Sequence, residues 1–368
     1  MKRLAGLLLL LLLSPARGEE TRIRLMFAGD VMGHDAQIAA ALSKNGTYDY
    51  APCFRYVKPI VESADLAVAN LEATLAGPPY TGYPRFSSPD ALADALKDAG
   101  FDLLLDANNH ACDRGGEGLA RTLKVLDEKK LLHTGAFASA EDRKNTYPLL
   151  VEVKGIRIAF LNATYGTNLL TVPDPYSVNG LDEKQIKTDL KKTREMKPDL
   201  IIMAVHWGVE YERKPNRDQL RLAKILFKNK VNIIVGSHPH VLQEIRAYGP
   251  RRRKRLVFYS VGNFLSNQRD RYRDGGMIAQ VEVVKDRRGT RIVRYGFTPT
   301  WVWRRREEEK PGFFILPDGA GEGLPDLGEK DKSAMDLFLS DARALFPETT
   351  EYKYRFRFKL DAEELPAR

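Results

Sequence analysis

The sequence has little cysteine: Cys53 and Cys112 are the only two thiols among 368 residues. Two isolated cysteines carry no spacing information, so they define no disulfide framework and offer no zinc-binding Cys cluster. We expect both to be free thiols. A disulfide between them is the alternative, because an oxidising compartment outside the cytoplasm would permit one.

Long apolar runs are also scarce, and the one clear run lies near the beginning of the sequence. Lys2-Arg3 precedes an apolar stretch from Leu4 to Leu13, and small residues follow between Ser14 and Gly18. This order is typical of a secretory signal peptide, and the stretch is too short to span a bilayer comfortably. We therefore expect residues 1–18 to be a signal peptide and the protein to be exported, either periplasmic or extracellular. An uncleaved membrane anchor is the alternative.

The chain has no internal repeat or low-complexity block, and its excess of positive charge is modest. The formal net charge is +9, and three basic residues lie within residues 1–18, so the remainder carries +6. Part of this excess is the run from Arg251 to Arg255. We expect no nucleic-acid partner, because no aromatic residues interleave the run and no nucleic-acid module surrounds it. The run fits either a solvated loop or a contact with an anionic polymer or lipid headgroup.

Apolar runs alternate with amphipathic stretches from Arg22 onward, and strands predominate after about residue 256. The pattern predicts strands over residues 23–28, 65–69, 101–107, 147–153, 156–162, 200–205, 231–235, 256–260, 277–284 and 291–297. It predicts helices over residues 34–43, 89–99, 118–130, 182–196, 218–229 and 333–346. Such an order favours an α/β fold with partly parallel, partly antiparallel sheets covered by helices. We expect one main domain over 22–305. Residues 306–368 would add a loop, mainly 307–332, and a helix packed on the body.

Polar side chains follow five of the predicted apolar strands, at the point where each strand ends. In open α/β sheets, sites gather at the carboxyl ends of the strands, where the loops converge. Carboxylate, amide and imidazole groups are suitable ligands for Zn, Mn or Fe. Four of the six histidines fall in these strand-end segments. The residues concerned are Asp30, Asn70, Glu72, Asn108, Asn109, His110, His206, His238 and His240.

Each of these residues also has a structural explanation when taken alone. A histidine beside a buried strand is often a core residue, Asp30 fits a helix cap, and Glu72 fits a surface charge. Asn109 tolerates a left-handed turn, and Asp113 fits a second helix cap. These explanations would have to hold at five places together, so we favour a divalent-metal site. His133 has no polar cluster around it, and we expect it to be structural.

These motifs, in this order, resemble the CapA family of bacterial capsule-synthesis proteins, which includes the membrane-linked component of poly-γ-glutamate synthesis. The resemblance covers roughly Arg24 to Phe264, with a weaker match at residues 298–302. The family is similar to the calcineurin-like metallophosphoesterases, which implies a four-layer α/β/β/α sandwich around two metal ions. The matching segments are residues 27–32, 70–72, 108–113, 206–208, 236–241 and 259–264.

The resemblance implies roles for individual residues. His110 would protonate the leaving group, and the metal ligands would be Asp30, Glu72, Asn109, His206, His238 and His240. Asp30 and His240 would bind the first ion, and His206 and His238 the second. Glu72 stands where the superfamily has a bridging Asp, and His34 follows Asp30 at a wider interval than the superfamily's Asp-x-His. The candidates for support of the ligands are His34, Asn70, Asp113 and Asn263.

Three functions are compatible with these residues. The first is an exported metal-dependent hydrolase, phosphoesterase-like, acting in capsule, poly-γ-glutamate or other surface-polymer metabolism. The second is a non-catalytic polymer-binding or assembly protein, and the third is a γ-glutamyl peptide hydrolase. The expected partners are an anionic surface polymer or a phosphoester substrate, together with membrane proteins of capsule synthesis.

Overall fold

The computed structural model describes residues 20–306, 312–319 and 324–354. The predicted signal peptide, residues 1–18, lies outside these described residues. Within them, no helix combines the length and the apolar character needed to cross a membrane. Cys53 and Cys112 are buried and both are free, which confirms the interpretation of two separate thiols.

A nine-stranded mixed sheet forms one half of the body. Its main path is β16-β15-β14-β1-β2-β3-β4, with β13 beside β1 and β17 beside β15. β1 to β4 run parallel, and β13 and β17 are parallel to β1 and β15, respectively, whereas β15 is antiparallel to both β14 and β16, and β14 is antiparallel to β1. The strands are β1 (Thr21–Val31), β2 (Leu66–Leu71), β3 (Leu103–Leu105), β4 (Leu132–Thr134), β13 (Asn263–Leu265), β14 (Gly275–Asp286), β15 (Gly289–Arg305), β16 (Gly312–Pro317) and β17 (Thr350–Glu351).

A six-stranded sheet in the order β11-β12-β10-β9-β7-β6 forms the other half. Its four central strands are parallel, and its two edge strands are antiparallel. The strands are β6 (Leu149–Val153), β7 (Ile156–Thr164), β9 (Leu200–His206), β10 (Ile233–Ser237), β11 (Ile245–Tyr248) and β12 (Arg255–Phe258). A separate two-stranded sheet pairs β5 (Ala136–Phe137) with β8 (Ser177–Val178).

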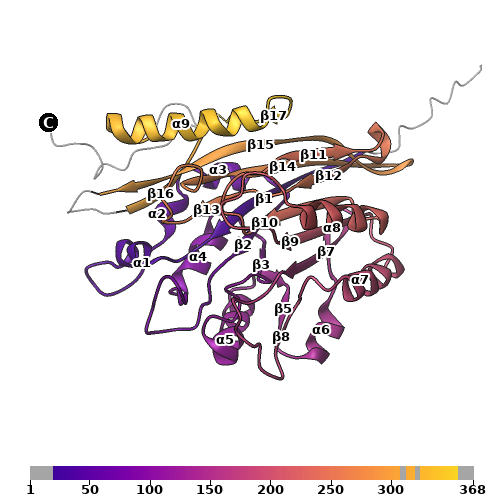
Figure 1. Ribbon diagram of the computed structural model, residues 1–368, viewed down its shortest axis with the longest axis horizontal. Helices are drawn as coiled ribbons and strands as arrows, with labels where there is room; N and C mark the ends of the chain where they lie inside the picture. Colours follow the sequence, from indigo (N-terminus) through magenta and orange to yellow (C-terminus); the bar gives the residue numbers. More distant parts are fainter. Residues whose placement is uncertain (1–19, 307–311, 320–323, 355–368) are drawn as a thin grey trace, which may run out of the picture.

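The two large sheets pack face to face, and helices cover their outer faces (Figure 1). Phe27 and Val68 of the first sheet share one core with Phe160 and Ile202 of the second. Side chains alternate between faces along each strand, so a second set of residues faces the helices. This confirms the four-layer α/β/β/α sandwich. The helices on the first sheet are α1 (Asp35–Ala41), α2 (Ala51–Phe54), α3 (Lys58–Val61), α4 (Ala91–Asp98) and α5 (Gly115–Glu128), and those on the second are α7 (Glu183–Glu195) and α8 (Arg217–Lys228).

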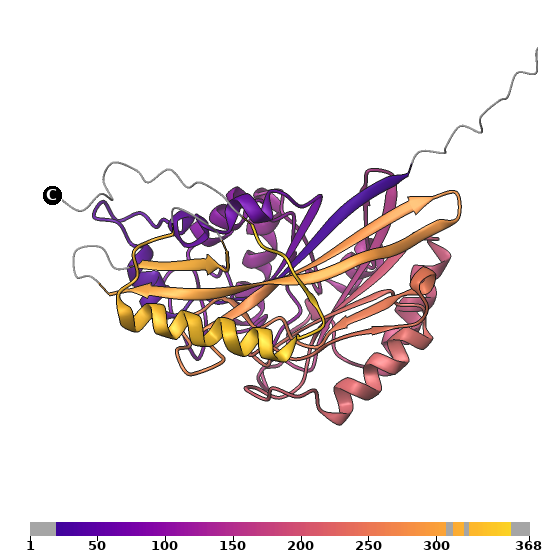
Figure 2. The same ribbon diagram turned by 90° about the horizontal axis from the view of Figure 1, so that it is seen from above.

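The helix α9 (Glu329–Leu345) packs on the first sheet, along β15 (Figures 1 and 2). Its residues Phe338 and Leu339 belong to the same core as Trp301 and Trp303 of β15. The terminal helix predicted from the sequence is therefore present, although it begins four residues earlier than the predicted residue 333.

Two sequence expectations need correction. The predicted loop over residues 307–332 contains β16, whose antiparallel pairing extends the first sheet beyond β15. Residues Phe313 to Leu316 are buried, because they contribute side chains to the cores on both faces of the sheet. The expected boundary at residue 305 therefore falls between two neighbouring strands of one sheet. The short helices α2 and α3 were also not predicted.

Candidate metal centre

The parallel strands of both sheets deliver polar side chains to one shared edge. β1 and β2 lie side by side in the first sheet, and Asp30 is paired in register with Asn70. β9 and β10 lie side by side in the second sheet, where His206 is paired with Ser237. The converging residues are Asp30, Asn70, Glu72, Asn108, Asn109, His110, His206, His238, His240 and Asn263, and all of them are buried.

Glu72 lies at the centre of the site. It belongs to two groups of ligand atoms, one with Asp30 and His206 and the other with His238 and His240. Within each group the ligand atoms lie within 4.8 Å of one another. The Oε1 atom of Glu72 is 3.7 Å from Nε2 of both His206 and His240. This oxygen is buried and has no hydrogen-bond partner among the described residues.

Asn70 connects the two buried carboxylates. Its Nδ2 atom donates to Oδ1 of Asp30 at 2.8 Å and to Oε2 of Glu72 at 3.3 Å. Asn108 donates in turn to Oδ1 of Asn70 at 3.3 Å and to the Leu71 carbonyl at 2.7 Å. Burial and the nearby Asp30 carboxylate raise the pKa of Glu72 well above its ordinary value. Two carboxylates held this close are costly unless a cation or a proton offsets their charge.

His240 has its tautomer set by Asn263. The Nδ2 atom of Asn263 donates to the Arg273 carbonyl at 2.7 Å, so Oδ1 of Asn263 faces His240. Nδ1 of His240 lies 3.0 Å from that oxygen and 3.1 Å from Oδ2 of Asp30, and it must carry the hydrogen, because both neighbours accept. The Nε2 lone pair is thereby left free, on the side of Glu72. A neutral imidazole with one free nitrogen is the form that binds a metal ion.

His206 and Asn109 bring two further ligand atoms together. Nδ1 of His206 contacts the Ser237 hydroxyl at 2.9 Å, and Nε2 lies 2.8 Å from Oδ1 of Asn109. The amide nitrogen of Asn109 is occupied, because it donates to Asn168 at 3.2 Å. Burial and the neighbouring His238 and His240 lower the pKa of His206 well below its ordinary value, which favours the neutral ring.

His238 sits on a strained turn after β10. Its φ angle is 96° and that of His240 is 56°, both in the left-handed region that non-glycine residues seldom occupy. Such strain concentrates at functional sites, where the surrounding fold holds the backbone in place. Nδ1 of His238 is buried and lacks a hydrogen-bond partner among the described residues. Burial and the adjacent His240 lower the pKa of His238 to about 3, so its ring is neutral at physiological pH.

His110 is held beside the ligands by Asp113. Its Nδ1 atom lies 2.7 Å from Oδ2 of Asp113, and the same oxygen accepts the backbone N–H of Phe86 at 2.8 Å. The Phe86 ring meets the imidazole edge to face, with 4.6 Å between the ring centres. His110 and Asn109 also line an open pocket of about 210 Å³, together with Tyr83, Asn168 and Glu210. The contact with Asp113 occupies Nδ1, so Nε2 is the ring nitrogen of His110 that Asp113 does not engage.

The remaining histidines lie outside both ligand groups. His34 precedes α1, and its Nδ1 atom contacts Gln37 at 3.0 Å and the Asn267 N–H at 3.3 Å. Burial lowers the pKa of His34 to about 4. His133 contacts Asp106 at 2.8 Å and Asp127 at 3.4 Å, so it does have polar neighbours, and its structural role stays a prediction.

Three residues without a role assigned from the sequence also reach the site, namely Tyr165, Asn108 and Ser237. Tyr165 follows β7, and its ring lies 4.5 Å from that of His238. The sequence could have indicated Tyr165, because it follows β7, a sixth largely apolar strand that ends at the same edge of the sheets. Asn108 and Ser237 lay within the matching motifs, but their contacts to Asn70 and His206 depend on the pairing of strands that are distant in sequence.

The ligand atoms fit a pair of divalent cations. They are carboxylate and amide oxygens and imidazole nitrogens, a set that suits Zn, Mn or Fe. Glu72 is common to both ligand groups, and its unpaired Oε1 atom lies 3.7 Å from Nε2 of His206 in one group and of His240 in the other. One ligand group contains Asp30 and His206, and the other contains His238 and His240. The family resemblance instead implied that His206 and His238 bind the same ion. The assignment of each residue to an ion stays a prediction.

Comparison with known proteins agrees with this architecture. A structure of NAD nucleotidase (NadN) from Haemophilus influenzae matches 88% of this chain and 63% of that one, with a TM-score of 0.52 and 14% identity. At this level of identity the likeness concerns the fold alone.

Two curated proteins are similar in sequence. The capsule biosynthesis protein CapA of Bacillus anthracis is 31% identical over 261 residues, which are 68% of this chain and 61% of that protein. The PGA biosynthesis protein CapA of Bacillus subtilis (strain 168) is 31% identical over 237 residues, 61% of this chain and 60% of its own length. The matched region thus spans about three fifths of each relative. The family model for the bacterial capsule synthesis protein PGA_cap matches residues 24–268, and this chain belongs to that family.

Proposed function

We propose that this chain is a metal-dependent hydrolase of the metallophosphoesterase type, acting in capsule or other cell-surface polymer metabolism. The observation that carries the proposal is the buried, unpaired Oε1 atom of Glu72, which lies 3.7 Å from Nε2 of both His206 and His240. Bound cations would offset the charge of Glu72 and Asp30, which lie together in a buried site. Membership of a capsule-synthesis family supports the biological setting.

Six residues would hold two divalent cations, of Mn, Fe or Zn. When bound, such a pair supplies an activated water as nucleophile and neutralises charge on the oxygens of the scissile group. The protein's own contribution is to position the ligands, through Asn70 for the carboxylates and Asn263 for His240. The six are Asp30, Glu72, Asn109, His206, His238 and His240.

His110 would protonate the leaving group. Asp113 accepts the Nδ1 hydrogen, and Phe86 restricts the ring, so that Nε2 can present a proton to a substrate in the adjacent pocket. A positioned general acid contributes roughly 10²–10⁴-fold to the rate. His110 is not one of the six proposed ligands. Removal of its side chain should therefore lower turnover and leave the metal content unchanged.

The test is turnover of a phosphomonoester, a phosphodiester and a γ-glutamyl peptide by the metal-loaded protein and by His110→Ala. We expect the variant to keep its metal and to lose at least about 10²-fold in kcat. His133→Gln is the matched control, because it changes a carboxylate-bonded histidine outside the ligand groups and should keep turnover. If the protein hydrolyses only the γ-glutamyl peptide, its reaction is amide hydrolysis and not the proposed phosphoester hydrolysis. Loss of metal from His110→Ala would contradict the assigned role.

We further propose that the protein is exported, supported by the order of Lys2-Arg3, the apolar stretch from Leu4 to Leu13 and the small residues up to Gly18. Amino-terminal sequencing of protein recovered outside the cytoplasm should begin close to Glu19. Recovery of the protein only from the cytoplasm would contradict export, and an intact leader in the membrane fraction would indicate an anchor.

A further inference from the structure

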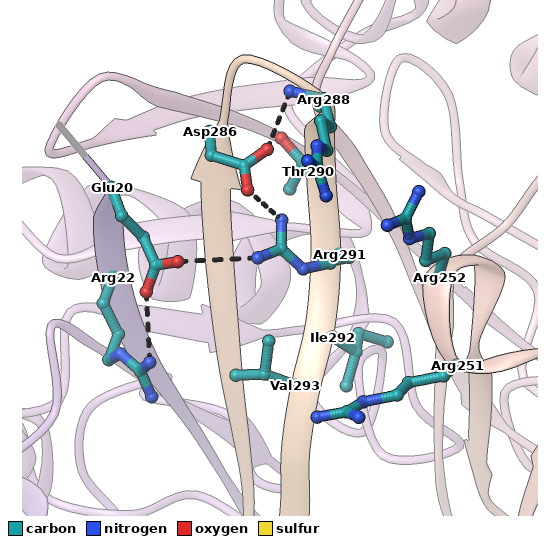
Figure 3. A pocket seen from close by; sticks show the side chains of 11 residues that line it. Glu20, Arg22, Arg251, Arg252, Asp286, Arg288, Thr290, Arg291, Ile292 and Val293 are labelled. Carbon is teal, nitrogen blue, oxygen red and sulfur yellow. Dashed lines mark hydrogen bonds and ion pairs between the residues drawn. The ribbon is translucent and has the colours of Figure 1, made fainter. Parts of the chain in front are cut away.

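A second concave site lies far from the candidate metal centre. It is a pocket of about 440 Å³ between the beginning of β1, the tip of the β14–β15 hairpin and the turn at Arg251–Arg253 that joins β11 to β12 (Figure 3). Arg22 lines this pocket, and Asp30 lies eight residues further along the same strand. At ~3.3 Å per residue, the two positions are about 26 Å apart. We call this site the arginine pocket.

The acidic residues of the arginine pocket are already paired. Glu20 accepts from Arg22 at 3.2 Å and from Arg291 at 3.5 Å. Asp286 accepts from Arg291 at 2.6 Å and from the backbone N–H of Arg288 at 2.7 Å. These contacts lower the pKa of Asp286, with the backbone hydrogen bond as the largest cause. Both carboxylates are therefore already occupied by contacts with arginine residues.

Three guanidinium groups are left over. Within the described part of the chain, no hydrogen bond or ion pair engages the side chains of Arg251, Arg252 or Arg288. Arg251 and Arg252 reach from the turn toward the strand that carries Arg291, and Arg288 stands at the hairpin tip (Figure 3). Five arginines and two carboxylates line the pocket, which leaves a net charge of +3. Like charges gathered from two different sheets repel one another unless an anion binds between them.

The chemistry of the arginine pocket suits oxyanions such as carboxylates. A guanidinium group presents a planar fork that matches a carboxylate or a phosphate bidentately, and three such groups from two separate segments suit several anionic groups on one chain. A surface that binds a bilayer typically has protruding basic side chains beside exposed apolar side chains. None of the large exposed apolar side chains of the described residues lines this pocket, whose apolar members include the buried Ile292.

We propose that the arginine pocket is an accessory binding site for a flexible polyanion with repeating carboxylate groups. Such a site retains a long polymer on the protein while a distant segment of the same polymer reaches the metal centre. The two contacts reinforce each other, because binding at one raises the local concentration of the chain at the other. The polymer-binding part of this proposal does not depend on hydrolysis.

The experiment compares binding of poly-γ-glutamate to the parent protein and to an Arg251→Gln, Arg252→Gln, Arg288→Gln variant, at two salt concentrations. We expect the variant to bind at least about tenfold more weakly and with less dependence on salt. The matched control is Lys184→Gln, Lys191→Gln, Lys224→Gln, which removes the same charge from exposed positions on α7 and α8. Both variants should keep the metal content and small-substrate turnover of the parent.

Two further measurements distinguish polymer binding in the arginine pocket from hydrolysis at the metal centre and from lipid binding. His110→Ala should bind the polymer as the parent does, so a failed hydrolase assay leaves this test intact. Vesicles containing phosphatidylglycerol test a lipid headgroup as the alternative anion. The proposal is overturned if the arginine variant binds the polymer with the affinity of the parent, or if the lysine variant loses as much polymer affinity as the arginine variant. It is also overturned if the protein binds the vesicles and does not bind the polymer.

Discussion

The Nδ1 atom of His240 lies 3.0 Å from Oδ1 of Asn263, and this contact determines which imidazole nitrogen is free for a metal ion. Asn263 is itself fixed, because its amide nitrogen donates to the Arg273 carbonyl at 2.7 Å and to Gln268 at 3.1 Å. The two residues are 23 positions apart, on different elements. Asn263 lies on β13, which pairs with β1 at Asp30. One strand pairing therefore aligns Asp30, a proposed ligand, with the residue that orients His240, another proposed ligand.

Replacing Asn263 with Ala should weaken metal binding without removing any ligand. The Nδ1 hydrogen of His240 would keep only Asp30 as a partner, so the ring would be less firmly held. Loss of such an orienting contact typically lowers metal affinity by about 10–100-fold. Titration calorimetry with Mn or Zn would measure the change. Asn145→Ala, on an exposed surface of α6 (Ala140–Thr146), is the control, and an equal effect of both substitutions would contradict the role of Asn263.

Replacing Glu72 with Gln should stabilise the metal-free protein and abolish tight metal binding. Burial and Asp30 raise the pKa of Glu72, which means that the folded state disfavours its negative charge. A group of this kind contributes stability when protonated and loses it as the pH rises through its folded pKa. At pH values above this raised pKa, where Glu72 is negative, the neutral amide should raise the free energy of unfolding in EDTA by ~1–3 kcal/mol. Urea unfolding in EDTA would test this, and lower stability of the variant would contradict it.

His133 should contribute to stability in a pH-dependent way. Burial opposes its charge, but Asp106 and then Asp127 outweigh burial and raise the pKa of His133 to about 9. The stabilisation is therefore fully present below the unfolded pKa of about 6.5 and lost as the pH rises through 9. We expect the parent to exceed His133→Gln by about 2 kcal/mol at pH 6 and to match it above pH 10. Unfolding in urea and EDTA at both pH values would show this, whereas a difference independent of pH would refute it.

Asp113 should act as a positioning residue for His110. In Asp113→Ala the imidazole loses its Nδ1 partner, so kcat should fall by about 10–100-fold while metal content and KM change little. Steady-state kinetics on whichever substrate the parent hydrolyses would measure the split between kcat and KM. Because Asp113 also accepts the Phe86 N–H, thermal unfolding of the variant serves as a check on folding. A rise in KM with unchanged kcat would contradict this role.

Much of the ligand geometry follows from features that are local in sequence. β2, β9 and β10 are continuous apolar runs, and β7 is nearly one, because both faces of these strands are buried. The polar residue after each run marks the sheet edge. The position of Glu72 or His206 can therefore be predicted from the end of its strand and the parallel pairing of the strands. Tyr165 follows the same rule after β7.

Other features depend on contacts that a single segment does not carry. β16 is a short strand next to charged and glycine-rich residues, and it becomes a strand only by pairing with β15. The proline-containing helices α2 and α3 are one turn long and are held by packing on the first sheet. The arginine pocket likewise joins the Arg251–Arg253 turn of one half of the body to the β14–β15 hairpin of the other. The basic run was visible in the sequence, but its neighbours were not.

Elemental analysis of the purified protein, beside a His238→Ala, His240→Ala variant, tests the central claim most directly. The ligand groups around Glu72 predict about two equivalents of Mn, Fe or Zn per chain in the parent and a loss of bound metal in the variant. A parent protein that binds no metal, even after incubation with each ion in turn, would contradict the metal centre and the hydrolase function proposed from it.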